Sequence, residues 1–259
     1  MNPAKPAAEM TATELAAYID HSVLKPEFTP QEVRREVQAA VALGCRTACV
    51  NPASISMAKN MTAGTQTGVC AVVDFPFGAS TTTSKATQAQ LAMDAGADEI
   101  DIVTNYGWAR AGLADQVEED LRAVVETCHA RNVIVKAILE TDALTEAQIR
   151  TTIEACVAAG TDFIKTSTGF YTGELHHAAP GASDAMMALM LEAAAGRTKV
   201  KGSGSIRDRA HFLRLIDAGV DRLGIGYRST PVVLGLAATG PCTPLQQNPH
   251  STTSADGVL

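Results

Sequence analysis

The sequence has few aromatic residues, no excess of positive charge and no long apolar run. Phe, Trp and Tyr make up 4% of its 259 residues, so the core is expected to consist of Ala, Val, Ile and Leu, the material of parallel sheets covered by helices. Lys and Arg total 21 against 28 acidic residues, a formal charge of −7, which makes nucleic acid or an anionic membrane an unsuitable partner. No apolar run reaches the ~18 residues that span a bilayer, and the first ten residues lack the order of a secretory signal. We expect a soluble, cytoplasmic protein.

Neither the cysteines nor the histidines show the spacing of a metal site or of a disulfide framework. The six cysteines contain no CxxC pair. Four lie in apolar segments, where free cysteine packs as a small hydrophobic side chain: Cys49, Cys70, Cys128 and Cys156. The six histidines form no HxH or HxxxH pair, and the adjacent His176 and His177 cannot easily face one ion. We therefore expect no metal.

One unit repeats along the chain: a short β-branched run, a loop and a longer segment of helical period. The predicted strands are residues 19–24, 46–50, 68–73, 99–104, 133–139, 162–166, 199–203 and 222–226. The predicted helices are residues 30–43, 52–60, 84–95, 115–130, 145–159, 183–195 and 208–218, with a short eighth at 231–238. Eight such units indicate a (β/α)8 TIM barrel. A doubly wound sheet is the alternative, but it usually has fewer strands, and no GxGxxG follows the first strand.

The ends of the chain differ from this repeat. Residues 11–18 predict an extra N-terminal helix, and the barrel is expected to occupy about residues 11–238 as a single domain. Residues 239–259 have no periodicity and are predicted to be disordered. Within the barrel, residues 95–98, 159–162 and 218–221 are near-repeats of the form Ala-Gly-x-Asp, and each directly precedes a predicted strand.

Charged residues stand inside the predicted strands, where apolar ones are expected. Asp101, Lys136, Lys165 and Lys201 lie on four consecutive strands, and Asp20 lies on the first. Because alternate residues of a barrel strand face its interior, these charges point into the barrel or press against helices. A buried unpaired ammonium is costly. A structural ion-pair network would explain Asp101 with one lysine, but three lysines around one or two carboxylates indicate a functional site.

The composition of this cluster indicates imine chemistry. A lysine that is partly desolvated and surrounded by cations loses its proton readily. A neutral amine attacks a carbonyl to form a Schiff base, and the iminium then acts as an electron sink. A nearby aspartate can move protons directly or through water. The cluster therefore predicts a carbonyl substrate.

Glycine-rich turns close the last two predicted strands, at residues 201–207 and 223–228, and residues 166–169 after the sixth strand add further hydrogen-bond donors. Loops at these positions of a barrel often bind phosphate through backbone N–H groups. Simple turn geometry is the alternative, because short glycine runs are common.

Seven segments together resemble deoxyribose-phosphate aldolase, a class I aldolase on a (β/α)8 barrel. They are IDHSVLKP at 19–26, CVNP at 49–52, FPFG at 75–78, DEID at 98–101, VKAILET at 135–141, FIKTSTGF at 163–170 and VKGSGSIR at 200–207. The segments follow the family order, and a looser match continues to about Gly226. FIKTSTGF is the most specific of them.

The resemblance implies a role for each matching residue. Lys165 would form the Schiff base, Lys201 would make Lys165 easier to deprotonate through its charge, and Asp101 would donate and accept protons through a water. Further residues would contact the substrate: Asp20, Ser22, Cys49, Lys136, Thr168, Gly169, Gly204, Ser205, Gly226 and Arg228. The implied reaction is the reversible cleavage of 2-deoxy-D-ribose 5-phosphate to acetaldehyde and D-glyceraldehyde 3-phosphate, a step of deoxynucleoside catabolism. The resemblance implies no metal or organic cofactor, a sugar phosphate and aldehydes as small-molecule partners, and a homodimer.

Two departures from the family pattern concern the phosphate end. Gly204-Ser205 stands where relatives commonly have Gly-Gly, and Gly226-Tyr227-Arg228 stands where they have a small serine-containing turn. Arg228 would replace lost hydroxyl donors with charge, while Tyr227 would narrow the pocket. We expect weaker discrimination between phosphorylated and free deoxyribose than in typical relatives.

Three alternatives stay open at this point. One is another lysine-dependent aldolase with a non-phosphorylated acceptor. A second is a non-catalytic barrel that binds a sugar phosphate, although binding alone does not need an imine-forming lysine. The third is a metal-dependent aldolase, which insensitivity to a chelator would remove.

Overall fold

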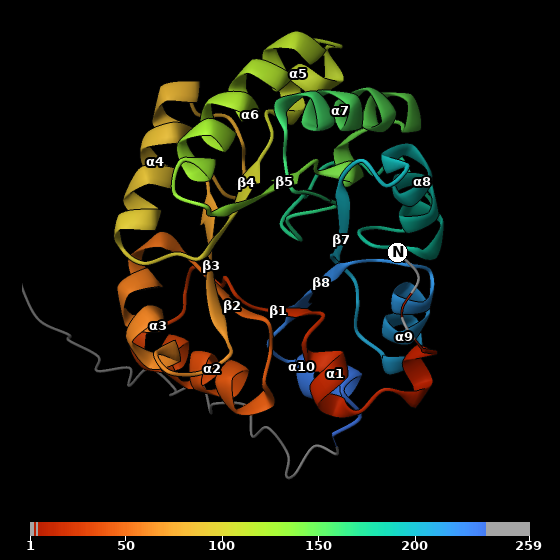
Figure 1. Cartoon of the computed structure of the whole chain (residues 1–259). Helices are drawn as coiled ribbons and strands as arrows, with labels where there is room; N and C mark the ends of the chain where they lie inside the picture. Colours follow the sequence, from red (N-terminus) through yellow and green to blue (C-terminus); the bar gives the residue numbers. More distant parts are fainter. Residues whose placement is uncertain (1–2, 4, 237–259) are drawn as a thin grey trace, which may run out of the picture.

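Eight parallel strands close into a barrel in chain order, as the repeat predicts (Figure 1). The computed structural model describes residue 3 and residues 5–236. The strands are β1 (Ile19–Val23), β2 (Thr47–Val50), β3 (Gly68–Val73), β4 (Glu99–Val103), β5 (Ile134–Ile138), β6 (Phe163–Lys165), β7 (Lys199–Ser203) and β8 (Arg222–Gly226). Because β8 pairs with β1, the sheet closes on itself. The (β/α)8 fold is confirmed.

The helices surround the strands as an outer layer in Figure 1. They are α1 (Ala12–Ala16), α2 (Pro30–Leu43), α3 (Ile55–Thr62), α4 (Thr82–Asp94), α5 (Tyr106–Arg110), α6 (Ala114–His129), α7 (Glu146–Ala159), α8 (Asp184–Ala194), α9 (Arg209–Asp217) and α10 (Thr230–Val233). Within the described residues, three short 3-10 helices accompany them, η1 (Ala7–Glu9), η2 (Pro52–Ser54) and η3 (Thr141–Ala143). The extra N-terminal helix is confirmed as α1.

One predicted helix differs from the observed structure, and one observed α-helix was not predicted. The segment predicted as one helix over 52–60 begins with the 3-10 turn η2, which starts at Pro52 and is followed directly by α3 from Ile55 to Thr62. The short helix α5 was not predicted, and it begins where the Asn105 side chain accepts a hydrogen bond from the backbone N–H of Trp108. The predicted tail at 239–259, and the last two residues of the helix predicted over 231–238, lie outside the described residues.

Local signals in the sequence explain where the helices begin and end. Thr29 and Thr145 cap α2 and α7 through complete capping boxes, in which Glu32 and Gln148 return the hydrogen bond. Gly44 closes α2 with a φ of 70°, in the left-handed region that glycine enters without strain. These signals determine where α2 and α7 begin and where α2 ends.

The three Ala-Gly-x-Asp near-repeats tie neighbouring strands together. Asp98, Asp162 and Asp221 each accept a hydrogen bond from the backbone N–H of a residue near the start of the preceding strand, at 2.8, 2.8 and 2.9 Å. Their own backbone N–H groups donate to the carbonyl of that same residue. The aspartate therefore replaces a missing ladder partner at the beginning of β3, β5 and β7, which explains why the motif recurs.

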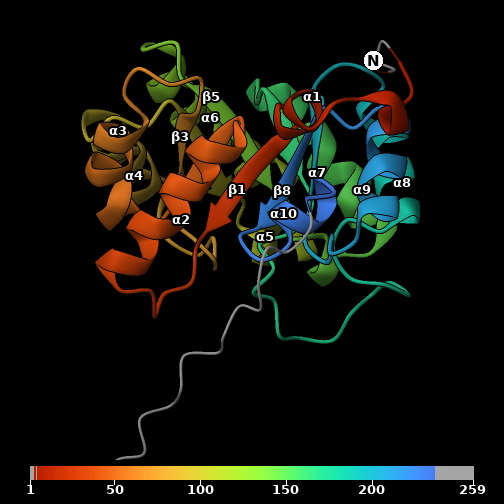
Figure 2. The ribbon, with the colours of Figure 1, turned by 90° about the horizontal axis from the view of Figure 1, so that it is seen from below.

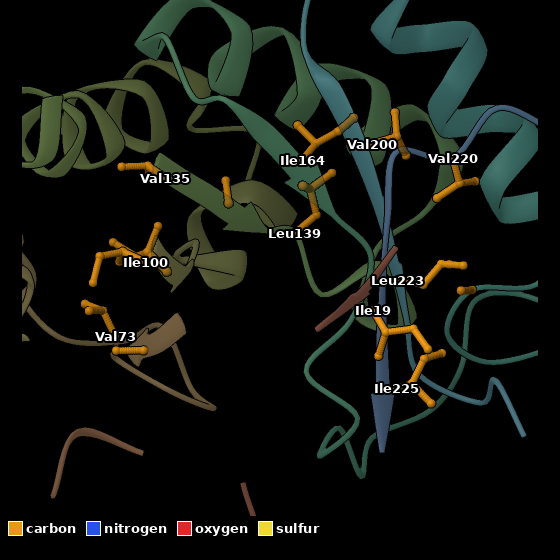
Figure 3. Packing of buried hydrophobic residues seen from close by; sticks show 14 of the residues in the cluster. Ile19, Val73, Ile100, Val135, Leu139, Ile164, Val200, Val220, Leu223 and Ile225 are labelled. Carbon is orange, nitrogen blue, oxygen red and sulfur yellow. The ribbon is translucent and has the colours of Figure 1, made fainter. Parts of the chain in front are cut away.

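The apolar core lies between the barrel and the helices. Strand residues that face outward form it together with the inner faces of the helices, and Figure 3 shows Ile19, Ile100, Val135, Ile164 and Leu223 among them. The inward-facing residues alternate with these, and many of them are charged. The structure thus separates an aliphatic outer layer from a polar barrel interior.

The two ends of the barrel are different. Figure 2 shows α1 at the end where β1 begins, and α5, α10 and the long loop after β6 at the opposite end, toward which the strands point. Active sites of TIM barrels lie at that second end. Among the described residues, no helix is both long and apolar enough to cross a membrane.

His21 lies on the outer side of β1 and is 1% exposed. Its Nδ1 atom is 2.8 Å from Thr230 Oγ1, and its Nε2 atom has no hydrogen-bond partner among the described residues. Burial lowers the pKa of His21 from 6.5 to about 4. The unfolded chain therefore binds a proton below pH 6.5 that the folded chain does not bind until about pH 4. His21 thus makes the fold lose stability as the pH falls through this window.

We expect His21→Gln to remove this loss. The free energy of unfolding of the wild type minus that of the variant should fall by about 3 kcal/mol between pH 7 and pH 4. Urea unfolding at several pH values measures this difference. Glu140, whose pKa is raised to about 7, has the opposite pH dependence, but it is present in both proteins and cancels in the difference. His129→Gln, on an exposed histidine, is the matched control. A difference that does not vary with pH would show that His21 is not the group responsible.

Candidate active site

Asp101 lies at the centre of the charged cluster that the sequence predicts. Its Oδ1 atom is 2.7 Å from Lys136 Nζ, and its Oδ2 atom is 2.8 Å from Lys165 Nζ and 2.7 Å from Lys201 Nζ. The four residues come from β4, β5, β6 and β7, whose in-register pairing places Asp101 beside Lys136 and Lys165 beside Lys201. All four are buried. The structure therefore brings the predicted catalytic residues together.

Two further residues of the cluster were not predicted. Arg222 Nη1 is 2.6 Å from Asp20 Oδ1 and 3.0 Å from Glu99 Oε2, and Glu99 Oε2 is also 2.7 Å from Lys136 Nζ. Glu99 stands two residues before Asp101 on β4, so the period of a strand places both on the inner face. That alternation is the signal from which Glu99 could have been found.

The cations determine how the carboxylates ionise. Burial opposes the ionisation of Asp101, but the three lysine ammonium groups outweigh it and hold the pKa of Asp101 well below its ordinary value. Burial likewise opposes a charge on Lys136 and Lys201, while the carboxylates around them outweigh it and raise the pKa of both. Asp101 is therefore a carboxylate, and Lys136 and Lys201 are ammonium ions, across the neutral pH range.

Two cysteines line the same interior. Cys49 and Cys70 are in register on β2 and β3, and the Cys70 thiol donates a hydrogen bond to Asp101 Oδ1 at 3.2 Å. Burial raises the pKa of the Cys70 thiol, so it keeps the proton that it donates. Cys49, Cys70 and Asp101 place three possible metal ligands within 4.8 Å of one another. However, Lys136 Nζ lies 3.3 Å from Cys70 Sγ, so an ammonium ion already contacts both Cys70 and Asp101.

A pocket of about 280 Å³ opens above this cluster at the carboxyl ends of the strands. Seven of the predicted site residues line it: Ser22, Lys165, Thr168, Gly169, Gly204, Ser205 and Gly226. Asp101, Lys201, Lys136, Asp20 and Cys49 are buried and are not among its lining residues in the described chain. Lys165 thus connects the two regions, because its amine contacts Asp101 and its side chain forms part of the pocket wall.

Arg228 does not line the pocket, within the described residues. It is exposed, and its guanidinium lies 5.2 Å from the centre of the Tyr227 ring, which packs edge-on against Phe28. Two other cations, Lys25 and Arg207, are lining residues instead, and Lys25 Nζ lies 5.6 Å from the centre of the Phe170 ring. Both stand in segments that carry the family resemblance, although neither was singled out as a site residue.

Glu140 holds one wall of the pocket. It follows β5 with a φ of 58°, a left-handed conformation that is uncommon outside glycine. Its carboxyl group accepts hydrogen bonds from the Thr168 hydroxyl and, at 3.2 Å, from the Thr168 backbone N–H. Burial raises the pKa of Glu140 to about 7. A buried acid thus fixes the loop that contributes Thr168 and Gly169 to the pocket.

The part of the pocket formed by Gly204 and Ser205 depends on close packing between two backbone segments. Gly181, in the loop after β6, packs directly on Gly204, and a Cβ atom at Gly181 would lie 2.6 Å from the Gly204 carbonyl carbon. The Ala182 N–H donates to the Gly204 carbonyl at 3.1 Å. Ser205 follows with a φ of 60°, in the left-handed region that favours glycine.

The barrel and its lysine-containing pocket define a TIM-barrel enzyme of the aldolase class. The chain belongs to the DeoC/LacD family of aldolases, which it matches over residues 14–238.

Individual relatives agree with this assignment. A deoxyribose-phosphate aldolase from Actinobacillus succinogenes is 40% identical over 215 residues, which are 83% of this chain and 92% of the relative. The structure of a putative deoxyribose-phosphate aldolase from Coccidioides immitis is 34% identical, with a TM-score of 0.79 over 86% of each chain. A deoxyribose phosphate aldolase from Aeropyrum pernix, described as a unique tetramer, is 27% identical, with a TM-score of 0.77 over 87% of this chain and 91% of that one.

Proposed function

We propose that this protein cleaves 2-deoxy-D-ribose 5-phosphate reversibly to acetaldehyde and D-glyceraldehyde 3-phosphate, with Lys165 as the Schiff-base nucleophile. The observation that carries the proposal is the placement of the Lys165 amine between the pocket and Asp101, with the Lys201 ammonium on the same carboxylate oxygen. The activity named for the relatives supports it. Binding alone would not need an amine at this place.

The first half of the reaction forms the imine. The free Lys165 amine adds to the C1 aldehyde of the open-chain sugar, and loss of water gives the iminium. Lys201 remains an ammonium ion, because Asp20 and Asp101 raise its pKa. Its charge beside Lys165 disfavours a second ammonium and so favours the free amine.

The second half breaks the carbon–carbon bond. The hydroxyl group on C3 loses its proton, the C2–C3 bond breaks, and its electron pair moves to the iminium, which becomes an enamine. Glyceraldehyde 3-phosphate is released. The enamine then takes a proton at C2, and water hydrolyses the resulting iminium to acetaldehyde and free Lys165. Asp101 is the carboxylate placed to relay these protons through a water, because its Oδ2 atom lies 2.8 Å from the Lys165 amine.

The charged groups near the pocket mouth support a phosphate as part of the substrate. Arg207 and Lys25 are cationic lining residues, and Ser205 and Gly204 offer backbone groups beside them. Cations and backbone N–H groups are the usual partners of phosphate at this end of a barrel. We infer that the β7–α9 loop and Lys25 hold the phosphate, whereas the exposed Arg228 contributes little.

We expect kcat/KM for deoxyribose 5-phosphate to exceed that for deoxyribose by less than about four decades. The physical reason is that Gly-Tyr-Arg replaces the usual serine turn after β8, and Arg228 is exposed and stacks on Tyr227. The two constants are measured side by side under the same conditions. Arg207→Met should reduce the ratio, while Arg228→Met is the matched control that should leave it unchanged. A preference of four decades or more would contradict this expectation.

The function itself is tested by incubating the protein with deoxyribose 5-phosphate and assaying both products with separate coupling enzymes. The proposal requires acetaldehyde and glyceraldehyde 3-phosphate in equal amounts, with and without a chelator. Loss of activity in the chelator would favour the metal-dependent alternative. Binding of the sugar phosphate without either product would favour the non-catalytic barrel. The predicted homodimer and cytoplasmic location stay predictions.

A further inference from the structure

Six charged side chains inside the barrel close into a ring in which the sign of the charge alternates. Each member contacts the next within ion-pair distance, and the last contacts the first. In order, the pairs are Lys136–Glu99 at 2.7 Å, Glu99–Arg222 at 3.0 Å, Arg222–Asp20 at 2.6 Å, Asp20–Lys201 at 2.5 Å, Lys201–Asp101 at 2.7 Å and Asp101–Lys136 at 2.7 Å. The members come from five different strands, and all are buried.

The ring has three cations and three anions, so its own charges balance. Lys165 stands outside it and is a fourth cation, joined at Asp101. Within the described chain, Asp101 is the one carboxylate in ion-pair contact with Lys165, and that carboxylate also contacts two ring lysines. With a positive Lys165 the cluster holds four cations and three anions, and with a neutral Lys165 amine it holds three of each.

Among the described residues, Glu99 and Arg222 form ion pairs with other members of the ring and not with Lys165. Neither is among the lining residues of the pocket within the described chain, so neither is placed to touch the substrate. Arg222 contacts both Asp20 and Glu99, and its guanidinium lies 5.5 Å from the centre of the Phe163 ring. Such a fixed cation orients the two carboxylates that in turn contact Lys201 and Lys136.

We propose that Arg222 and Glu99 are positioning residues that keep the ring electrically neutral and thereby leave Lys165 as the amine that deprotonates. This inference rests on the proposed function, in which Lys165 reacts as a free amine. It extends the control of Lys165 beyond Lys201 to the Arg222–Glu99 ion pair, which acts through the other members of the ring. The role is electrostatic, so the sign of each substitution decides the direction of its effect.

Substitutions at Arg222 and at Glu99 are expected to shift the pH dependence of imine formation in opposite directions. Removing the Arg222 charge leaves a net negative ring, which stabilises the Lys165 ammonium, so imine formation requires a higher pH. Removing the Glu99 charge leaves a net positive ring and has the reverse effect. The other ionisable groups near Lys165, which are Asp101, Lys136, Lys201, Glu140 and Cys49, are the same in both variants. A loss of packing would not give shifts of opposite sign.

The experiment follows the rate at which cyanoborohydride traps acetaldehyde on the protein between pH 5 and pH 10. The midpoint of the acidic limb should move up by about one pH unit in Arg222→Gln and down by about one unit in Glu99→Gln. The double variant should return toward the wild type, and Arg222→Lys, which keeps the charge, should rescue most of the Arg222→Gln shift. Arg46→Gln is the matched control, because Arg46 lies 3.9 Å from Glu99 but its side chain is 54% exposed and screened by solvent.

Shifts in the same direction, or no shift in either variant, would overturn the inference. Folding of each variant is checked by circular dichroism. If Arg222→Gln does not fold, the sign of the Glu99→Gln shift decides, since a shift to lower pH supports the inference and any other result overturns it. Trapping on the wild-type protein distinguishes a failure of the proposed function from a failure of the inference about Arg222 and Glu99. Its absence would mean that the proposed function has failed, whereas normal trapping with unshifted variants would reject only the role of the ring.

Discussion

Replacing Lys165 by alanine is expected to lower kcat/KM for deoxyribose 5-phosphate by about four decades or more, because the variant has no amine at the pocket to carry the imine. The fold should be retained. Lys165 has one ion-pair partner in the described structure, Asp101, which keeps the ammonium groups of Lys136 and Lys201 in the variant. Thermal unfolding should therefore stay within a few degrees of the wild type, so the loss of activity reports chemistry and not misfolding.

The matched control for this change is Lys199→Ala. Lys199 lies two residues before Lys201 on β7, is exposed, and stacks near the Phe163 ring. Its removal should change kcat/KM by less than about twofold, since it faces neither the pocket nor Asp101. Turnover by Lys165→Ala within tenfold of the wild type would rule out Lys165 as the nucleophile.

Asp101→Asn is expected to have the second-largest effect and to act on both stability and chemistry. The substitution keeps the shape of the side chain but removes the anion that three buried ammonium groups share. Loss of one partner from a buried ion pair costs about 3–5 kcal/mol, which urea unfolding would show. Cleavage of deoxyribose 5-phosphate should fall by about two to four decades, the usual contribution of a group that transfers protons.

Trapping of acetaldehyde separates this role from that of Lys165. Because removal of the anion favours the free amine, Asp101→Asn should still be trapped by cyanoborohydride even though it cleaves the sugar poorly. A variant that loses trapping and cleavage to the same extent would indicate that Asp101 positions Lys165 and does not move protons. A variant of normal activity would remove Asp101 from the mechanism.

The sequence specifies much of this fold because its local signals agree with one another. Each predicted strand overlaps an observed one, since short β-branched runs alternate with segments of helical period along the chain. The charged cluster was predictable for the same reason. A charge such as Lys136, between Val135 and Ala137, contradicts the local pattern of a strand, and such contradictions occur at functional sites.

The unpredicted features depend on contacts between distant parts of the chain. Arg222 contacts Glu99, which is 123 residues away in the sequence, and no local sequence pattern indicates this pairing. Glu140 adopts a left-handed conformation, which a sequence predicts for glycine or asparagine but not for glutamate. Its role depends on the hydrogen bond that it accepts from Thr168, a residue from another loop. Arg228 has the charge expected of a phosphate ligand, but the Tyr227 ring holds it outside the pocket. The alternation of residues along a strand predicts which side chains face the barrel interior, but the ion-pair partner of each one depends on how the strands are arranged in the closed barrel.

The most direct test of the central claim is to trap the protein with acetaldehyde and cyanoborohydride, digest it, and map the modified residue by mass spectrometry. We predict a mass gain of one ethyl group on Lys165, in the peptide that contains FIKTSTGF, and none on Lys136 or Lys201, whose raised pKa keeps them protonated. An ethyl group on Lys136 or Lys201 in place of Lys165, or no modified lysine in the barrel at all, would contradict the account.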